Sequence, residues 1–202
     1  MKLYYSPGAC SLSPHIALLE AGLKVELVLA STKTKKLADG SDFYLINAKG
    51  SVPVLELDNG ERLTEGPAIV QYIADLAPDK QLAPPNGTLP RYRLQEWLNF
   101  ITSELHKGFS PLFNPATTEE YKPQVRTKLA ERFAWIDQQL EGKQYLMGDQ
   151  FSVADGYLFV VSNWGQYVGV DVSGFANLVA FRARVAARPA VIAAMTAEGL
   201  LK

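Results

Sequence analysis

The stretch KLYYSPGACSLSPHIALLEAGLKVELVL, residues 2–29, decides the fold of the first part of the chain. Its aromatic-rich start predicts a short strand over 2–6, which a Pro-Gly pair ends. Apolar residues at helical spacing and a glycine stop then predict a helix over 11–21, and residues 25–29 predict a second strand. A strand, a helix and a strand in so short a stretch indicate a βαβ unit with parallel strands.

The next elements extend this unit by a hairpin and a helix. A strand over 52–57 begins with a proline, and Asp58-Asn59-Gly60 predicts a tight turn. Residues 61–64 then return antiparallel, and Pro67 begins a helix that continues through Leu76. A βαβ unit followed by a hairpin and a helix is the order of a thioredoxin-like domain.

Beyond this part the pattern becomes helical. Residues 78–90 (PDKQLAPPNGTLP) are rich in proline and predict a linker. Helix-spaced apolar residues follow over 94–113, 119–140, 153–168 and 175–187, and Pro189 is placed to begin a last helix. Ser152 and Asp155 have the spacing of a helix-capping pair. We therefore predict an α/β thioredoxin-like N-terminal domain (1–80), a linker (81–90) and an all-α C-terminal domain (91–202).

Composition excludes several classes of function. The 202 residues hold 20 Lys and Arg against 21 Asp and Glu, so no basic excess exists to neutralise a phosphate backbone. One cysteine cannot form an internal disulfide, and with only two histidines it cannot build a four-ligand zinc site of thiolates and imidazoles. No stretch could span a bilayer as an apolar helix. We expect a cytoplasmic protein without a metal or nucleotide cofactor and without nucleic acid or membrane partners.

The single cysteine, Cys10, is the first candidate for chemistry. It lies between the first strand and the first helix, where the positive end of the helix dipole favours a thiolate and lowers its pKa. The alternative is a buried and inert cysteine. No second cysteine stands near it, which excludes a dithiol centre of the C-x-x-C type.

Further candidates follow at element boundaries. Glu65 and Gly66 begin a helix, where N–H groups suit a carboxylate and Glu65 suits an ammonium, although Glu65 could be an ordinary first-turn acid. His106 belongs to a polar stripe with Asn99, Ser103 and Ser110 at helical spacing. Such a stripe usually faces water, whereas beside a cleft His106 would be a candidate acid, base or donor. His15, inside an apolar helix, is expected to be structural.

Five stretches in order carry a resemblance to a known family: residues 1–19, 49–57, 63–76, 98–113 and 145–159. With Cys10 and His106 at their places, the chain resembles a bacterial beta-class glutathione S-transferase over its whole length. The resemblance implies a cytosolic transferase fold, a homodimer, and glutathione as a substrate that is joined to hydrophobic electrophiles in detoxification. It also implies a second activity, in which Cys10 forms a mixed disulfide with glutathione during thiol–disulfide exchange.

The resemblance also implies roles for individual residues. Cys10 and His106 would be catalytic, with Tyr5 and Ser11 as further donors to the thiol. Val52 would pair with the cysteinyl backbone of glutathione beside a cis Pro53. The other residues expected to bind glutathione are Lys35, Glu65, Gly66, Asn99, Ser103, Glu104 and Leu105. The expected electrophile pocket consists of aromatic residues that could equally be core, namely Phe109, Phe113, Tyr157 and Trp164.

Two positions depart from the family pattern. Many relatives carry serine at the position of Gly66 and glutamine at the position of Ser51, so we expect altered affinity for glutathione and retained binding. A different class of function stays open, in which the fold serves as a binding or regulatory module without catalysis. The presence of both Cys10 and His106 argues against that alternative.

Overall fold

The computed structural model describes residues 1–201 and divides them into two compact units. The first unit contains residues 1–83 together with 188–201, and the second contains residues 84–187. This division differs from the expected one, because the last residues of the chain, assigned from the sequence to a helical domain over 91–202, pack with the N-terminal unit.

The first unit contains a mixed sheet in the order β2-β1-β3-β4. Its strands are β1 (Lys2–Tyr5), β2 (Glu26–Leu29), β3 (Val54–Glu56) and β4 (Arg62–Thr64). β1 pairs parallel with β2 and antiparallel with β3, and β3 pairs antiparallel with β4. The predicted βαβ unit and hairpin are confirmed, and the first unit has the thioredoxin-like arrangement.

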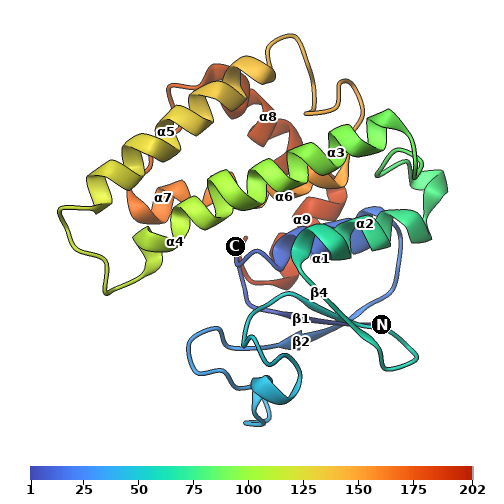
Figure 1. Cartoon of the computed structure of the whole chain (residues 1–202). Helices are drawn as coiled ribbons and strands as arrows, with labels where there is room; N and C mark the ends of the chain where they lie inside the picture. The colour runs from blue at the N-terminus through green and yellow to red at the C-terminus, as the bar shows by residue number, and fades with distance from the viewer. Residues whose placement is uncertain (202) are drawn as a thin grey trace. The chain divides into compact units, whose positions relative to one another are not determined.

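Two helices of this unit lie on the same face of the sheet, α1 (Leu12–Glu20) and α2 (Gly66–Leu76) (Figure 1). The core between these elements consists of fully buried aliphatic side chains from both layers, among them Leu3, Leu18, Leu55, Ile69 and Ile73. Short 3₁₀ helices lie at Phe43–Leu45 and Pro78–Lys80. Phe43 belongs to a smaller apolar cluster with Tyr4, Ala30, Val52 and Val54. This cluster holds the loop before β3, where Val52 and Pro53 lie.

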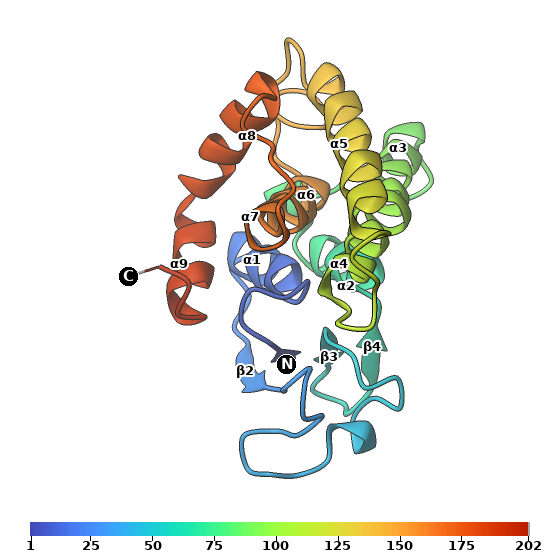
Figure 2. The same ribbon diagram turned by 90° about the vertical axis from the view of Figure 1, so that its left-hand side faces the viewer.

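The helix α9 (Pro189–Ala197) packs beside α1 (Figure 2), which explains why the C-terminal segment belongs to the first unit. Two polar contacts accompany the apolar packing. The Arg188 guanidinium donates two hydrogen bonds to the carboxylate of Glu20 at 2.6 and 2.8 Å. Glu198, directly after α9, lies 2.9 Å from Nδ1 of the buried His15. His15 is therefore structural, as predicted.

The second unit is helical in all its described elements. They are α3 (Leu89–Phe100), a π-helical segment (Ile101–His106), α4 (Lys107–Phe113), α5 (Lys122–Gln139), α6 (Val153–Asn163), α7 (Gly165–Val168) and α8 (Ala176–Ala186). The stretch 89–113 is one continuous helical rod with a π-helical middle, and α5 packs beside it (Figures 1 and 2). Large side chains fill the core: Leu94, Leu98, Phe109, Phe133 and Phe181.

The start of α6 is held by a capping box. The Ser152 hydroxyl and the backbone N–H of Ser152 both donate to Asp155 Oδ2 at 2.7 Å, and the N–H of Leu146 donates to Oδ1 at 2.8 Å. The Asp155 side chain is fully buried, and burial raises its pKa to about 6 against the opposing effect of these hydrogen bonds. The carboxylate thus joins the loop before α6 to the helix itself, as the sequence pair predicted.

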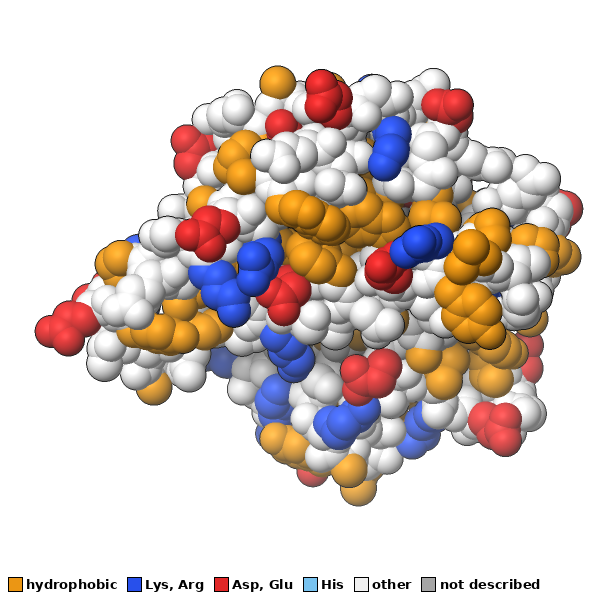
Figure 3. Space-filling model, turned by 45° about the horizontal axis from the view of Figure 1, so that its top comes forward, with side chains coloured by type: hydrophobic (Ala, Val, Ile, Leu, Met, Phe, Trp, Pro, Cys, Tyr) orange, Lys and Arg blue, Asp and Glu red, His pale blue; other side chains and the backbone are white. Residues whose placement is uncertain are grey.

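The surface shown in Figure 3 carries Lys and Arg side chains interspersed with Asp and Glu, and hydrophobic side chains gather among them. The exposed apolar residues of the second unit include Trp135, which packs against Trp97 and Phe100 at ring-centroid distances of 5.4 and 4.7 Å. Of the helices in residues 1–201, none is long and apolar enough to cross a membrane.

Candidate functional site

The loop that carries Cys10 is closed by its own hydrogen bonds. The N–H of Ala9 donates to the Ser6 carbonyl at 3.0 Å. The Ser11 hydroxyl accepts from the N–H of Ser6 at 3.1 Å and lies 3.2 Å from the Ser6 carbonyl, to which it donates. Because that bond uses the one hydroxyl hydrogen, Ser11 shapes the loop, and it would have to give up this bond to act as the expected donor to the thiol.

The same loop is tied to the end of the chain through Gly8. Its backbone lies at φ +69°, a conformation that favours glycine, and its N–H donates to Glu198 Oε2 at 3.0 Å. The other oxygen of Glu198 accepts from Nδ1 of His15. Glu198 therefore positions the loop before Cys10, and sequence reasoning missed this residue because it stands 190 positions away from Gly8.

Cys10 and Val52 are brought together, as expected. Cys10 is half-buried, and its Sγ donates to the carbonyl oxygen of Val52 at 3.3 Å. The Val52–Pro53 peptide bond is cis, as the resemblance implied. The only cysteine of the chain thus lies beside the backbone that precedes β3.

The start of α2 has an unusual backbone. Glu65, the residue before the helix, lies at φ +69° and ψ 111°, although it is not a glycine. Its carbonyl accepts from the N–H groups of Ala68 and Ile69, each at 3.0 Å. Non-glycine residues with such a strained backbone cluster at functional sites, which makes Glu65 a candidate site residue.

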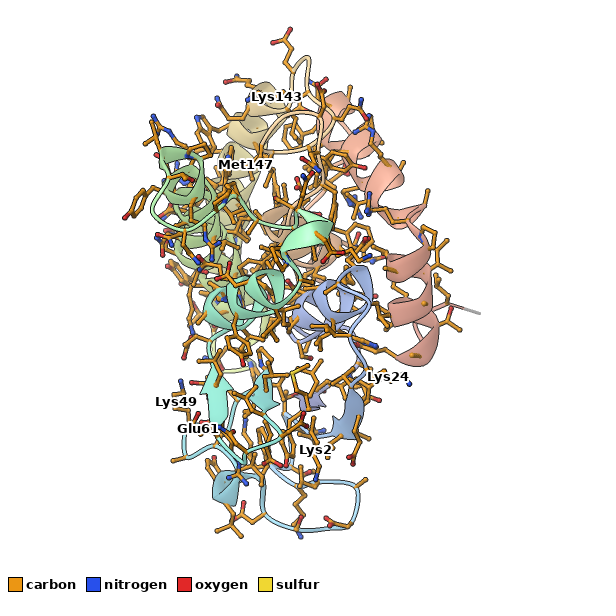
Figure 4. The ribbon with its side chains drawn as sticks, turned by 90° about the vertical axis from the view of Figure 1, so that its right-hand side faces the viewer. Lys2, Lys24, Lys49, Glu61, Lys143 and Met147 are labelled. Atoms are coloured by element: carbon orange, nitrogen blue, oxygen red, sulfur yellow. The ribbon has the colours of Figure 1, made fainter. Side chains whose placement is uncertain are left out.

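Lys49 joins this group and was not predicted. Its Nζ donates to the carboxylate of Glu65 and, at 3.0 Å, to the hydroxyl of Thr64 in β4. The side chain lies next to β4 at the edge of the sheet (Figure 4). An ammonium therefore occupies the place at Glu65 that the sequence assigned to the amino group of a ligand. No pattern around Lys49 could have indicated this, since the two residues meet only through the hairpin.

Gly66 leaves room for a side chain. A Cβ built there lies 3.9 Å from Cγ of Pro53, which is ordinary van der Waals contact, and the backbone of Gly66 has no positive φ. We expect Gly66→Ser to fold normally and to tighten glutathione binding about two- to tenfold, the value of one added hydrogen bond. Isothermal titration calorimetry measures the change. Gly174→Ser, at another open glycine, is the matched control, and equal affinities of both variants and the parent would contradict the expectation.

Lys35 is a second lysine whose side chain reaches the loop before β3. Its backbone lies at φ +57°, and its Nζ donates to the Gly50 carbonyl at 2.7 Å. The bond places the ammonium beside Gly50, which precedes Val52 by two residues. A carboxylate that approaches this loop would meet Lys35, and the side chain would exchange its bond with Gly50 for an ion pair.

The π-helical segment changes the polar stripe expected in the second unit. Asn99, Ser103 and Ser110 are exposed, and the Ser103 hydroxyl donates to the Asn99 carbonyl at 3.1 Å. His106, at the end of the π-helical segment, is only half-exposed and its Nδ1 lies 2.6 Å from the Tyr157 hydroxyl in α6. The structure therefore separates His106 from the exposed part of the stripe.

Glu104 and Leu105, both expected to bind glutathione, contact other residues of the helical unit. The Glu104 carboxylate accepts from Nε of Arg132 at 2.8 Å. The Leu105 side chain is fully buried in the helical core, so its backbone is what it could offer to a ligand.

Aromatic rings surround His106. The Tyr157 hydroxyl lies 2.6 Å from its Nδ1, and the Trp164 ring lies 4.9 Å from the imidazole with an interplanar angle of 72°. Trp164 also contacts Phe109 and Phe113 edge-on at 5.9 and 6.0 Å. The four aromatic residues expected as an electrophile pocket thus form one cluster, in which Tyr157 and Trp164 contact the histidine. Phe109 is fully buried and fills the core, whereas Phe113 is half exposed.

Within residues 1–201, the His, Cys, Asp and Glu side chains form no group of three or more that could hold a metal ion. The candidate groups of the first unit are a thiol beside a strand, two lysines and a carboxylate at a helix start. The candidate group of the second unit is an imidazole among aromatic rings. A thioredoxin-like domain with a thiol beside a strand, followed by a helical domain with an imidazole, is typical of two-domain enzymes that act on thiols.

Comparison with known proteins gives the family. Residues 1–75 match the family described as "Glutathione S-transferase, N-terminal domain", and residues 100–189 match "Glutathione S-transferase, C-terminal domain". The chain belongs to the glutathione S-transferase family and is an enzyme of its bacterial beta class.

Individual relatives agree with this assignment over their whole length. Glutathione S-transferase GstA of Escherichia coli O157:H7 is 48% identical over 200 residues, which cover 99% of this chain and 100% of the relative. A ternary complex of BphK, a bacterial GST, is 60% identical with a TM-score of 0.97, and the match covers 99% of this chain and 100% of that one. A sphingomonad glutathione S-transferase complexed with glutathione is 49% identical over 100% of both chains, with a TM-score of 0.95.

Proposed function

We propose that this transferase joins the thiolate of glutathione to small hydrophobic electrophiles, with the tripeptide bound against the loop and strand around Cys10. The observation that carries the proposal is the position of the Cys10 thiol, 3.3 Å from the carbonyl oxygen of Val52 and beside the cis Pro53. A ligand whose backbone pairs with Val52 as an added strand would bring its own cysteine next to Cys10.

The charged groups of the first unit suit the two ends of glutathione. Its γ-glutamyl end carries a carboxylate and an ammonium on one carbon. The N–H groups at the start of α2 suit the carboxylate, and Glu65 suits the ammonium by exchanging its bond with Lys49. Lys35 suits the carboxylate at the glycine end. Gly66 offers its backbone N–H, and Asn99, Ser103, Glu104, Leu105 and His106 are the residues proposed from the helical unit.

The reaction needs the glutathione thiol as a thiolate. The positive end of α1 and hydrogen-bond donors favour loss of the proton, and His106 is the side chain proposed to assist. The sulfur then attacks the electrophile, a carbon–sulfur bond forms, and the leaving group departs with the bonding electrons. Aromatic side chains at Phe109, Phe113, Tyr157 and Trp164 suit an apolar second substrate.

Cys10 also permits a second activity, thiol–disulfide exchange. Its thiolate attacks oxidised glutathione, a Cys10–glutathione disulfide forms, and one glutathione thiolate leaves. A free glutathione thiolate then attacks the glutathione sulfur of the mixed disulfide, which releases oxidised glutathione and restores the Cys10 thiolate. When Cys10 instead attacks the glutathione sulfur of a disulfide between glutathione and another thiol, that thiol leaves in reduced form, and free glutathione supplies the two electrons.

The experiment pairs the wild type with Cys10→Ala. Intact mass after incubation with oxidised glutathione reports the mixed disulfide, and a model aromatic halide reports conjugation. We expect an adduct on the wild type only, loss of exchange in the variant, and conjugation in both proteins with a modest change. Loss of both activities in the variant with glutathione binding intact would contradict the separate roles.

A glutathione-affinity column distinguishes the remaining alternative. Retention of the wild type, without adduct formation and without turnover on a panel of electrophiles and disulfides, would indicate a binding or regulatory module. Conjugation without an adduct would confine the function to transfer.

We further propose a homodimer in the cytoplasm. The resemblance supports the dimer, and exposed aromatic surface such as that of Trp135 is available to be buried in it. The single cysteine supports a reducing compartment. Sedimentation velocity tests the dimer, and a sedimentation coefficient of a monomer at micromolar concentration would contradict it.

A further inference from the structure

Two elements determine the orientation of His106. Its Nδ1 lies 2.6 Å from the hydroxyl oxygen of Tyr157 in α6, and the two rings stand nearly perpendicular at 5.9 Å. The ring of Trp164, which follows α6, contacts the imidazole from 4.9 Å. Tyr157 is 3% exposed, so its hydroxyl is a buried group whose hydrogen must be donated. These two contacts therefore orient the imidazole. The next question is whether the Tyr157 hydroxyl or His106 Nδ1 donates the hydrogen bond between them.

Thr102 decides which acceptors the Tyr157 hydroxyl has. The Thr102 hydroxyl donates to the Leu98 carbonyl at 2.7 Å, which uses its one hydrogen. Its oxygen lies 3.5 Å from the Tyr157 oxygen and can there only accept. The Thr102 oxygen thus lies at the limit of hydrogen-bond distance from the Tyr157 oxygen, whereas Nδ1 of His106 lies at a short distance. The geometry favours Nδ1, and a phenol is the stronger acid of the phenol–imidazole pair.

We propose that Tyr157 is a positioning residue that holds neutral His106 with its hydrogen on Nε2. When the Tyr157 hydroxyl donates to Nδ1, that nitrogen carries no hydrogen, and the ring's other nitrogen must carry it. His106 then presents an N–H donor at Nε2 and is no base there. This inference rests on the proposed function for its catalytic meaning: an N–H donor stabilises a thiolate, whereas a bare nitrogen lone pair would repel it.

His15 provides an internal reference of the opposite kind. Its Nδ1 faces the Glu198 carboxylate at 2.9 Å, and a carboxylate can only accept, so the His15 hydrogen lies on Nδ1. The chain has two histidines. A single spectrum of the folded protein should therefore show one neutral imidazole of each tautomer, and the two can be assigned by His15→Gln.

The experiment uses full-length protein with ¹⁵N-labelled histidine and long-range ¹⁵N–¹H correlation at about pH 9, well above the ordinary imidazole pKa of about 6.5. The wild type should show His106 with its hydrogen on Nε2. Tyr157→Phe keeps the ring and removes the donor, so His106 should become a mixture of both tautomers. Thr102→Val, which removes the weaker acceptor, is the matched control and should leave the His106 pattern unchanged. A wild-type His106 with its hydrogen on Nδ1 overturns the proposal, even if Tyr157→Phe does not fold.

Steady-state kinetics test whether Tyr157 contributes to catalysis through His106. Tyr157→Phe should lower kcat for conjugation about tenfold, the value of one well-placed hydrogen bond, and leave KM for glutathione nearly unchanged. On a His106→Ala background the same substitution should have no further effect, because Tyr157 acts through the imidazole. Equal effects on both backgrounds would overturn the positioning role. If the wild type performs no conjugation, the proposed function fails, and the tautomer measured by NMR still decides the assignment of Tyr157.

Discussion

Asp155→Ala is expected to lower the free energy of unfolding by about 4 kcal/mol, a large share of the stability of a typical domain. Three donors point at the buried carboxylate: the Leu146 N–H, the Ser152 N–H and the Ser152 hydroxyl. Alanine leaves these donors buried without an acceptor, and each such group costs about 1–3 kcal/mol. Urea denaturation monitored by circular dichroism measures the loss.

Two further variants make this test sharp. Asp171→Ala removes an exposed aspartate that accepts a hydrogen bond from the N–H of the nearby Ser173, and it should cost less than about 1 kcal/mol. A loss of similar size in both variants would contradict the special role of Asp155. Asp155→Asn keeps the shape of the side chain and serves as the reference for pH dependence.

The pH dependence follows from the raised pKa of Asp155. Burial moves that pKa from 3.8 to about 6, so the folded protein binds a proton at a pH at which the unfolded chain does not. Acidification through this interval therefore stabilises the wild type relative to Asp155→Asn, which cannot titrate. The difference between their unfolding free energies should grow by about 1.4 kcal/mol from about pH 7 to about pH 5. A constant difference would show an unshifted pKa.

Glu198→Ala is expected to lower the free energy of unfolding by about 3 kcal/mol. Its buried carboxylate accepts from the Gly8 N–H at 3.0 Å and from His15 Nδ1 at 2.9 Å, and both donors lose their acceptor in the variant. Because Gly8 belongs to the loop that carries Cys10, hydrogen exchange at that loop should rise together with the loss of stability. Thermal unfolding and amide exchange measure the two effects.

The control for Glu198 is another glutamate in an ion pair. Glu96 lies on the surface of α3 and pairs with Arg93, so Glu96→Ala should change stability by less than about 0.5 kcal/mol. Glu198→Gln keeps one acceptor and should lose an intermediate amount. Undisturbed exchange at residues 6–10 in Glu198→Ala would mean that the loop holds its shape without the C-terminal segment.

Local patterns predicted most elements of the fold. The βαβ unit, the hairpin turn at 58–60, the helix after Pro67 and the capping pair at Ser152 and Asp155 each depend on neighbours in the chain. Composition and turn residues carry such information directly. The place of Cys10 beside Val52 was expected only through resemblance, because 42 residues separate them.

What could not be predicted depends on contacts far apart in the chain or on irregular backbone. The π-helical segment Ile101–His106 departs from the regular helical period, and His106 is only half-exposed, whereas the other residues of the stripe are exposed. The positive φ of Glu65 and its contact with Lys49 have no signature in local sequence. Glu198 reaches Gly8 only after the whole chain has folded back, which no local rule describes.

That return of α9 to α1 has a consequence for synthesis of the protein on the ribosome. The first unit needs residues 188–201, so its sequence is complete only after these residues have been synthesised, whereas the sequence of the second unit is complete at residue 187. N-terminal domains usually fold first during synthesis, but here the ribosome completes the sequence of the second unit before that of the first. The hydrogen bond from Gly8 to Glu198, which holds the loop of Cys10, forms only after residue 198 has emerged from the exit tunnel.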